Sequence, residues 1–138
     1  MITLTNAGSV LELPEDLYWS DELTWSEVAQ QTERGIFGTL IVDAMARSGG
    51  RPITLQGEGN SAWIMRSTLK TLKAWANVPG LLMTLDVRGE TFTVAFDHGD
   101  AEESRALAMS AVIEFADMQD GDYYCSLVLR FIEASPTL

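Results

Sequence analysis

The sequence is poor in the residues that carry most protein chemistry, with one cysteine, Cys125, and one histidine, His98. A single cysteine cannot form an internal disulfide, so nothing in the sequence indicates an oxidising compartment. Cys125 lies in the apolar run 123–129, where we expect a buried and unreactive side chain. His98 follows a strand-like segment, has no nucleophile beside it, and is expected to be an exposed loop histidine.

Basic residues are also scarce: nine Lys and Arg oppose twenty Asp and Glu, giving a net charge of −11. This balance works against binding nucleic acid through its phosphates, which depends on cations. Only Arg66, Lys70 and Lys73 fall on one predicted helical face. The acidity is compatible either with simple solubility or with a passage to which DNA must not adhere.

Long apolar runs are absent, since no stretch approaches the roughly 20 residues that a membrane helix needs. The first residues lack the basic-then-apolar pattern of a signal peptide. We therefore expect synthesis in the cytoplasm and no membrane anchor. No linker, low-complexity tract or repeat divides the chain, and 46% hydrophobic residues support one packed domain over residues 1–138.

No motif of catalysis or metal binding occurs. The sequence has no Gly-x-Ser-x-Gly, His-Glu-x-x-His, Cys-x-x-Cys or phosphate-binding glycine loop. Asp117, Asp120 and Asp122 resemble a calcium loop only superficially, because the EF-hand spacing and its final glutamate are missing. We therefore predict no catalytic, cofactor-binding or metal-binding residues, no cofactor, and no enzyme activity.

Alternation of apolar and polar residues predicts that most of the chain is β-structure. The first strands are expected at 2–5 and 9–13. Two more, at 25–30 and 36–42, surround a turn near residues 33–35. The segment 36–45, which includes the second of these strands, is expected to pair with 53–57 as a hairpin with a long loop.

One helix is predicted over residues 62–76, with Asn60 or Ser61 as its N-cap. An apolar stripe that should pack on the sheet repeats at helical spacing through Met65, Leu69, Leu72 and Ala76.

After the helix, 81–87 and 91–96 should form a hairpin around Arg88-Gly89-Glu90, and 107–116 should pair with 122–133 across an Asp-Gly turn. The predicted fold class is mainly β with one α-helix. We expect a single-domain β-barrel or sandwich with a flanking helix, because that arrangement hides sheet edges.

Two irregular segments, 15–25 and 46–52, are candidate subunit contacts, because they carry Trp, Tyr and Arg, which are frequent in interfaces. The alternative is that Trp19 and Trp25 simply fill the domain core. The candidate interface residues are Trp19, Asp21, Glu22, Trp25, Arg47 and Arg51.

The order of elements and two short motifs resemble the small tail proteins of long-tailed bacteriophages. The motifs are the acidic-aromatic opening Leu13-Pro14-Glu15-Asp16-Leu17-Tyr18-Trp19-Ser20-Asp21-Glu22 and the later Gly50-Arg51-Pro52-Ile53-Thr54-Leu55. Within that group the chain is most similar to distal tail, or baseplate hub, proteins with the tail-tube-like fold.

The resemblance implies a virion structural protein at the tail tip that forms a homo-oligomer, expected to be a hexameric ring. The ring would join the tail tube protein to the tip or hub proteins and surround a channel through which DNA passes without specific binding. Two alternatives stay open: a tail-tube or tail-completion subunit, and a free-standing adaptor or ligand-binding β-barrel. Many distal tail proteins also carry a second, carbohydrate-binding-like domain, for which we expect no room here.

Overall fold

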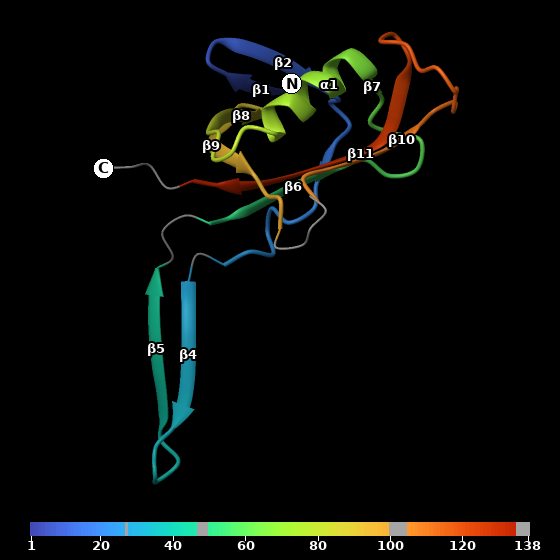
Figure 1. The fold of residues 1–138 in the computed structure, drawn as a ribbon. Helices are drawn as coiled ribbons and strands as arrows, with labels where there is room; N and C mark the ends of the chain where they lie inside the picture. The colour runs from blue at the N-terminus through green and yellow to red at the C-terminus, as the bar shows by residue number, and fades with distance from the viewer. Residues whose placement is uncertain (27, 47–49, 100–104, 135–138) are drawn as a thin grey trace.

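The structure is a computed structural model that describes residues 1–26, 28–46, 50–99 and 105–134. Strands make up most of its regular structure and a single helix, α1, lies in mid-chain (Figure 1). In chain order the elements are β1 (Ile2–Asn6), β2 (Ser9–Leu13), β3 (Tyr18–Trp19), β4 (Val28–Arg34), β5 (Leu40–Ala46), β6 (Pro52–Gln56), β7 (Ile64–Met65), α1 (Arg66–Ala76), β8 (Met83–Val87), β9 (Glu90–Phe96), β10 (Leu107–Ala111) and β11 (Tyr123–Glu133).

The strands form one large antiparallel sheet and one separate hairpin. The large sheet has nine strands, with β2-β1-β8-β9-β11-β6-β3 as neighbours and with β7 and β10 also paired to β11. The separate sheet consists of β4 and β5 alone. The prediction of a mainly β domain with one flanking helix is confirmed in its open, sandwich-like form. The described strands do not close into a barrel, because β2 and β3 end the row without meeting.

Strand β11 is the centre of the large sheet. It pairs with β10 and β7 in its first half and with β6 and β9 toward its end. Cys125, Leu127, Leu129 and Phe131 alternate along it and are all buried, as period-two patterning requires. Ser126 has a φ of 54° where the register with β10 shifts, so a bulge bends β11 between its two sets of partners.

The hairpin β8–β9 confirms its sequence prediction. Arg88 and Gly89 have φ values of 51° and 97°, which match the two-residue turn that suits the twist of paired strands. The Arg88 side chain also donates a hydrogen bond to the Leu17 carbonyl at 2.9 Å. This bond ties the turn to the segment that precedes β3.

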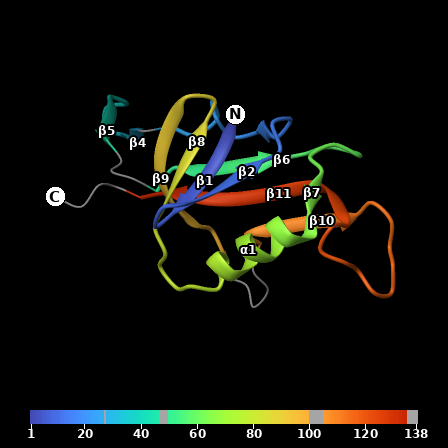
Figure 2. The same ribbon diagram turned by 90° about the horizontal axis from the view of Figure 1, so that it is seen from above.

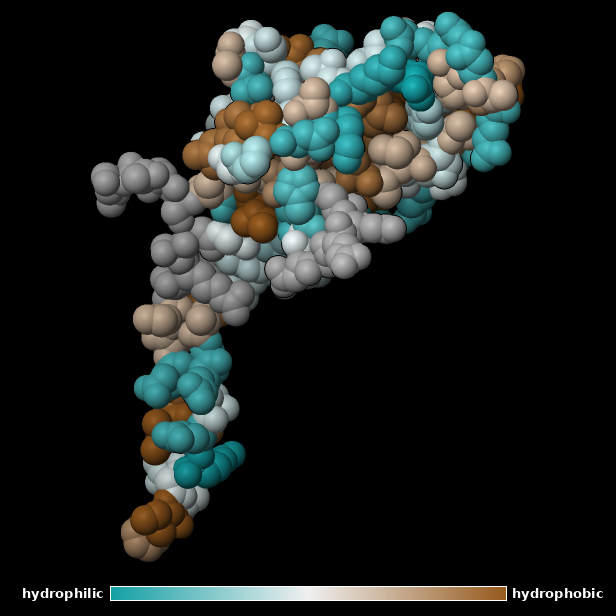
Figure 3. All heavy atoms as spheres, in the orientation of Figure 1, coloured by the Kyte–Doolittle hydropathy of each residue, from teal (hydrophilic) through white to brown (hydrophobic). Residues whose placement is uncertain are grey.

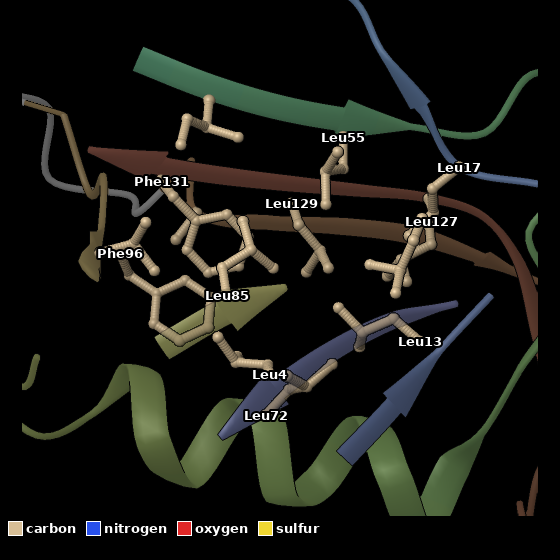
Figure 4. Close-up of a cluster of buried hydrophobic side chains, with 14 of the residues drawn as sticks. Leu4, Leu13, Leu17, Leu55, Leu72, Leu85, Phe96, Leu127, Leu129 and Phe131 are labelled. Carbon is tan, nitrogen blue, oxygen red and sulfur yellow. The ribbon is translucent and has the colours of Figure 1, made fainter. Parts of the chain in front are cut away.

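The core lies where the large sheet curves over on itself. Side chains from β6 and β11 meet side chains from β1 and β8, and α1 runs along the open side (Figure 4). The side chains drawn there include Leu4, Leu13, Leu17, Leu55, Leu72, Leu85, Phe96, Leu127, Leu129 and Phe131.

The helix is shorter than predicted and begins differently. Residues 64 and 65 form β7, and α1 begins at Arg66 with Met65 in the N-cap position and no side-chain cap. The prediction of Asn60 or Ser61 as the cap was wrong, because pairing with β11 keeps the chain extended up to Met65. Leu69, Leu72 and Ala76 are buried, as predicted, whereas Met65 is exposed.

The predicted hairpin between 36–45 and 53–57 was also wrong. Strand β5 pairs with β4 across a short turn, and β6 pairs with β11 and β3. Closing the short β4–β5 loop costs less chain entropy than closing the longer one. Strand β6 alternates buried Ile53 and Leu55 with partly exposed residues, which suits a place beside β11.

Three smaller predictions can be compared directly. Cys125 is buried and His98 is exposed, so both of those predictions are confirmed. In the described part of the chain, no helix has the length and apolar character needed to cross a bilayer.

We predict that Leu72→Ala lowers the free energy of unfolding by about 2–5 kcal/mol, because the side chain is 0% exposed and the neighbouring sheet cannot collapse fully into the space. Lys73→Ala, on the exposed side of α1, should change it by less than about 0.5 kcal/mol. Urea unfolding followed by circular dichroism measures both. A small loss for Leu72→Ala would mean that α1 does not close the core.

Candidate assembly interface

The β4–β5 hairpin, residues 28–46, stands apart from the rest of the molecule, and we call it the arm. Figure 1 shows it extending away from the large sheet, and among the described residues its strands pair only with each other. Nearly every described residue of β4 is exposed. The arm therefore presents its length and its end to the surroundings.

The end of the arm carries two apolar side chains that nothing covers. Gly38 donates a backbone hydrogen bond to Gly35 at 3.0 Å, which closes a turn with Ile36 and Phe37 at its centre. Their side chains are 98% and 97% exposed. Hydrophobic atoms accordingly cover the free end of the arm in Figure 3. Such turns usually carry polar residues, so an Ile-Phe pair here suggests a contact.

Strand β5 is apolar on both of its faces. Leu40, Ile41 and Val42 follow one another, and Met45 continues the pattern. Because successive strand residues point to opposite sides, a run of this kind is typical of a strand covered on both faces. In the arm, however, all four side chains are exposed.

Among the described residues, no strand pairs with either outer edge of the arm. Natural proteins block open strand edges with lysine, proline, bulges or covering segments. Residues 28–46 contain no lysine or proline, and their charged residues are Glu33, Arg34 and Asp43. A two-stranded hairpin on its own is marginally stable in water, so the arm has the character of an element that is completed by a partner.

Four of the interface residues predicted from the sequence, Trp19, Asp21, Glu22 and Arg51, lie away from the arm, beside β3 and β6. Trp19 is only 5% exposed and packs edge-on against Phe92, with ring centroids 5.3 Å apart. The Arg51 guanidinium lies over the Trp19 ring, 4.9 Å from its centroid, and donates a hydrogen bond to the Glu22 carbonyl at 2.8 Å. These contacts join the two sequence motifs within one subunit.

Asp21 covers the edge of β6 that β3 leaves open. Its two carboxylate oxygens accept hydrogen bonds from the Thr54 amide and hydroxyl, both at 2.9 Å. The Thr54 carbonyl in turn accepts a bond from the Ser20 amide at 3.0 Å. The segment 19–22 therefore completes the sheet edge as a short extension of β3.

The remaining candidates do not join this cluster. Trp25 is partly buried and lines a hollow of about 530 Å³ together with His98 and Arg105. Arg47 lies outside the described residues. A contact with another subunit through Trp19, Asp21, Glu22, Trp25, Arg47 or Arg51 stays a prediction. The structure adds that Trp19, Asp21 and Arg51 also stabilise the fold.

A second exposed apolar surface surrounds the connection between β10 and β11. Trp63, Ile113, Phe115 and Tyr123 line a hollow of about 230 Å³, which we call the aromatic pocket. Each of these side chains is about half exposed, and the rings of Trp63 and Tyr123 lie 5.7 Å apart. Exposed aromatic clusters of this kind are frequent anchors in protein interfaces.

The three cations of α1 lie beside a different surface, which we call the basic groove. Arg66, Lys70 and Lys73 line a hollow of about 340 Å³ with apolar side chains of α1 and β10. Lys70 donates a hydrogen bond to Asp120 at 2.8 Å, and this bond, with the charge of Lys70, lowers the pKa of Asp120. The connection between β10 and β11 is thereby fixed to the helix.

In the part of the chain that the structure describes, no His, Cys, Asp and Glu residues gather in threes or more to hold a metal ion. The arm was not among the contact segments expected from the sequence. The available signals were the Ile36-Phe37 pair between two glycines and the apolar run 40–42.

We predict that Asp21→Ala lowers the free energy of unfolding by about 1–3 kcal/mol, because the partly buried Thr54 amide loses its acceptor. Glu22→Ala is the matched control: the Glu22 backbone carbonyl, not its side chain, binds Arg51, so a change within about 0.5 kcal/mol is expected. Denaturant unfolding gives both values. Equal effects of the two substitutions would contradict the role assigned to Asp21.

No family model, curated protein or solved structure matches the chain. A proposal of function therefore rests on the sequence and on the physical features described above.

Proposed function

We propose that the protein is a structural subunit that assembles with copies of itself through its arm. In this proposal it is a virion protein that forms a ring, expected to be hexameric, at the distal end of a phage tail. The ring joins the tail tube to the tip proteins and surrounds the DNA channel.

The observation that carries the proposal is the unpartnered arm. A marginally stable hairpin with an apolar strand and an uncovered Ile-Phe end is costly for a protein that works alone. Burying one such side chain is worth about 1.5–3 kcal/mol, so covering Ile36 and Phe37 alone supplies a substantial driving force for association.

The phage-tail part of the proposal is supported by the resemblance of the two motifs and by the charge of −11. An acidic ring repels the duplex that moves through it, which favours passage over adhesion. A tail-tube or tail-completion subunit is the alternative within the same class. A free-standing adaptor is the alternative outside it, and the mass of the particle in solution separates this alternative from a ring.

We predict that the wild-type chain forms particles several times the mass of one chain, and that the double variant Ile36→Ser with Phe37→Ser shifts them toward single chains. The loss of two apolar anchors removes about 3–6 kcal/mol from each contact. Light scattering coupled to size-exclusion chromatography, at matched concentrations, measures the mass.

Leu82→Ser is the control for this experiment, because Leu82 is an exposed apolar residue in a loop outside the arm. It should leave the particle mass unchanged. A wild-type chain that stays monomeric at all concentrations would contradict the assembly proposal and favour the adaptor.

We further predict that the assembled protein does not bind duplex DNA in the micromolar range, even near ~50 mM salt, where phosphate contacts are strongest. The cations of the basic groove are too few to offset the acidic surface. A fluorescence-anisotropy titration with a labelled duplex tests this. Micromolar or tighter binding that disappears on adding salt would overturn the passive channel.

A further inference from the structure

The arm and the aromatic pocket lie at opposite ends of the molecule. In Figure 1 the free end of the arm and the loop between β10 and β11 are the two most distant parts of the chain, and Figure 2 separates them again in the perpendicular view. The arm of a given chain therefore does not reach its own pocket. A second copy, however, can bring an arm to it.

The two surfaces match in apolar character. Ile36 and Phe37 are the most exposed apolar side chains at the end of the arm. The aromatic pocket is a hollow of about 230 Å³ whose walls include Trp63, Ile113 and Phe115. Apolar anchors that fill pockets lined by aromatic residues dominate the energy of many interfaces.

The two surfaces also match in charge. Arg34, the cation of the arm, donates a hydrogen bond to the Gly38 carbonyl at 3.1 Å, which holds its guanidinium beside the exposed turn. The loop that forms the pocket, residues 112–122, carries no cation and contains Glu114, Asp117, Asp120 and Asp122. Of these, Glu114 and Asp117 are exposed, and Asp122 lines the pocket.

Charge also argues against the other hollow beside β10. The basic groove presents Arg66, Lys70 and Lys73, so an arm docked there would bring Arg34 against three like charges. The neighbouring Glu33 points to the opposite face of the arm, because successive strand residues alternate. The aromatic pocket is thus the acceptor that suits both the apolar pair and Arg34.

We propose that the arm of one copy inserts Ile36 and Phe37 into the aromatic pocket of a second copy, with Arg34 facing the carboxylates of the loop 112–122. This inference rests on the proposed function and names the surface that receives the arm. Because the donor and acceptor surfaces are different and lie at opposite ends, the contact is head-to-tail. Such contacts close into rings when the rotation between copies permits.

The test uses full-length chains with one end of the contact removed. Phe37→Ser removes the anchor and keeps the pocket, whereas Phe115→Ser damages the pocket and keeps the anchor. Each variant alone should associate at least roughly tenfold more weakly than the wild type, since each lacks a central apolar contact. Mixed together they should form a two-chain species that grows no further, because only one intact anchor and one intact pocket meet.

The proposed attraction between Arg34 and the carboxylates of the loop 112–122 is tested by exchanging the charges of the two sides. Arg34→Glu should weaken association, and combining it with Glu114→Arg and Asp117→Arg in the same chain should restore it. Lys73→Glu, in the basic groove, is the matched control and should have no effect. Analytical ultracentrifugation measures the association constants, and circular dichroism confirms that every variant is folded.

The outcomes distinguish the proposed assembly through the arm from the proposed docking of the arm in the aromatic pocket. If the wild type assembles and Phe37→Ser prevents it, while Phe115→Ser assembles normally, the arm mediates assembly but the aromatic pocket is not its acceptor. A change of association in Lys73→Glu, in either direction, would assign the acceptor to the basic groove and overturn this inference. A wild type that never assembles would overturn the proposed function itself.

Discussion

The fold depends on the pairing of β11 with strands on both of its sides. Its buried side chains, Leu127, Leu129 and Phe131, form one wall of the core, and its backbone joins β6 and β9 to β7 and β10. The bulge at Ser126 bends β11 so that this one strand can pair with both sets of neighbouring strands. Because the large sheet remains open, its edges need other protection. Asp21 and Ser20 provide it at β6, and α1 covers the side of the core where the sheet does not close.

The arm is the exception to this pattern of covered edges and buried apolar side chains. Within the described residues, the chain covers the edge of β6 with a carboxylate but leaves both edges of β4–β5 unpaired and Ile36 and Phe37 exposed. Natural proteins break local rules of sheet construction mostly at functional sites, and we propose that the contact compensating for the arm lies outside the subunit. This contrast, rather than any single residue, connects the structure to assembly.

Local signals in the sequence predicted local structure well. Arg88-Gly89-Glu90 indicated a tight hairpin, and the spacing of Leu69, Leu72 and Ala76 indicated the buried side of the helix. For β5 the sequence indicated two partners, the strand before it across a turn and the segment 53–57, because apolar patterning shows that a strand is to be covered but not by which strand. The structure pairs β5 with β4. Asn60 and Ser61 looked like helix caps, yet long-range pairing of β7 with β11 moved the start of α1.

The candidate interface was also predictable from the sequence only in part, because local patterns do not identify the partner of a side chain. Trp19 and Arg51 have the composition of interface residues, but within the subunit they stack on each other beside Phe92. Composition alone cannot distinguish an aromatic-arginine pair that binds a partner from one that stabilises its own sheet. The exposed Ile-Phe turn differed from ordinary turn chemistry and was the stronger signal, because a turn has no core of its own in which to bury such residues.

The central claim is that the arm is completed by another copy of the chain. Hydrogen–deuterium exchange of the arm amides, followed by mass spectrometry over a range of protein concentrations, tests it most directly. Peptides covering 28–46 should exchange rapidly in dilute protein and become protected as association proceeds, while the amides of β11 stay protected throughout. Exchange in the arm that is independent of concentration, in protein that demonstrably assembles, would contradict it.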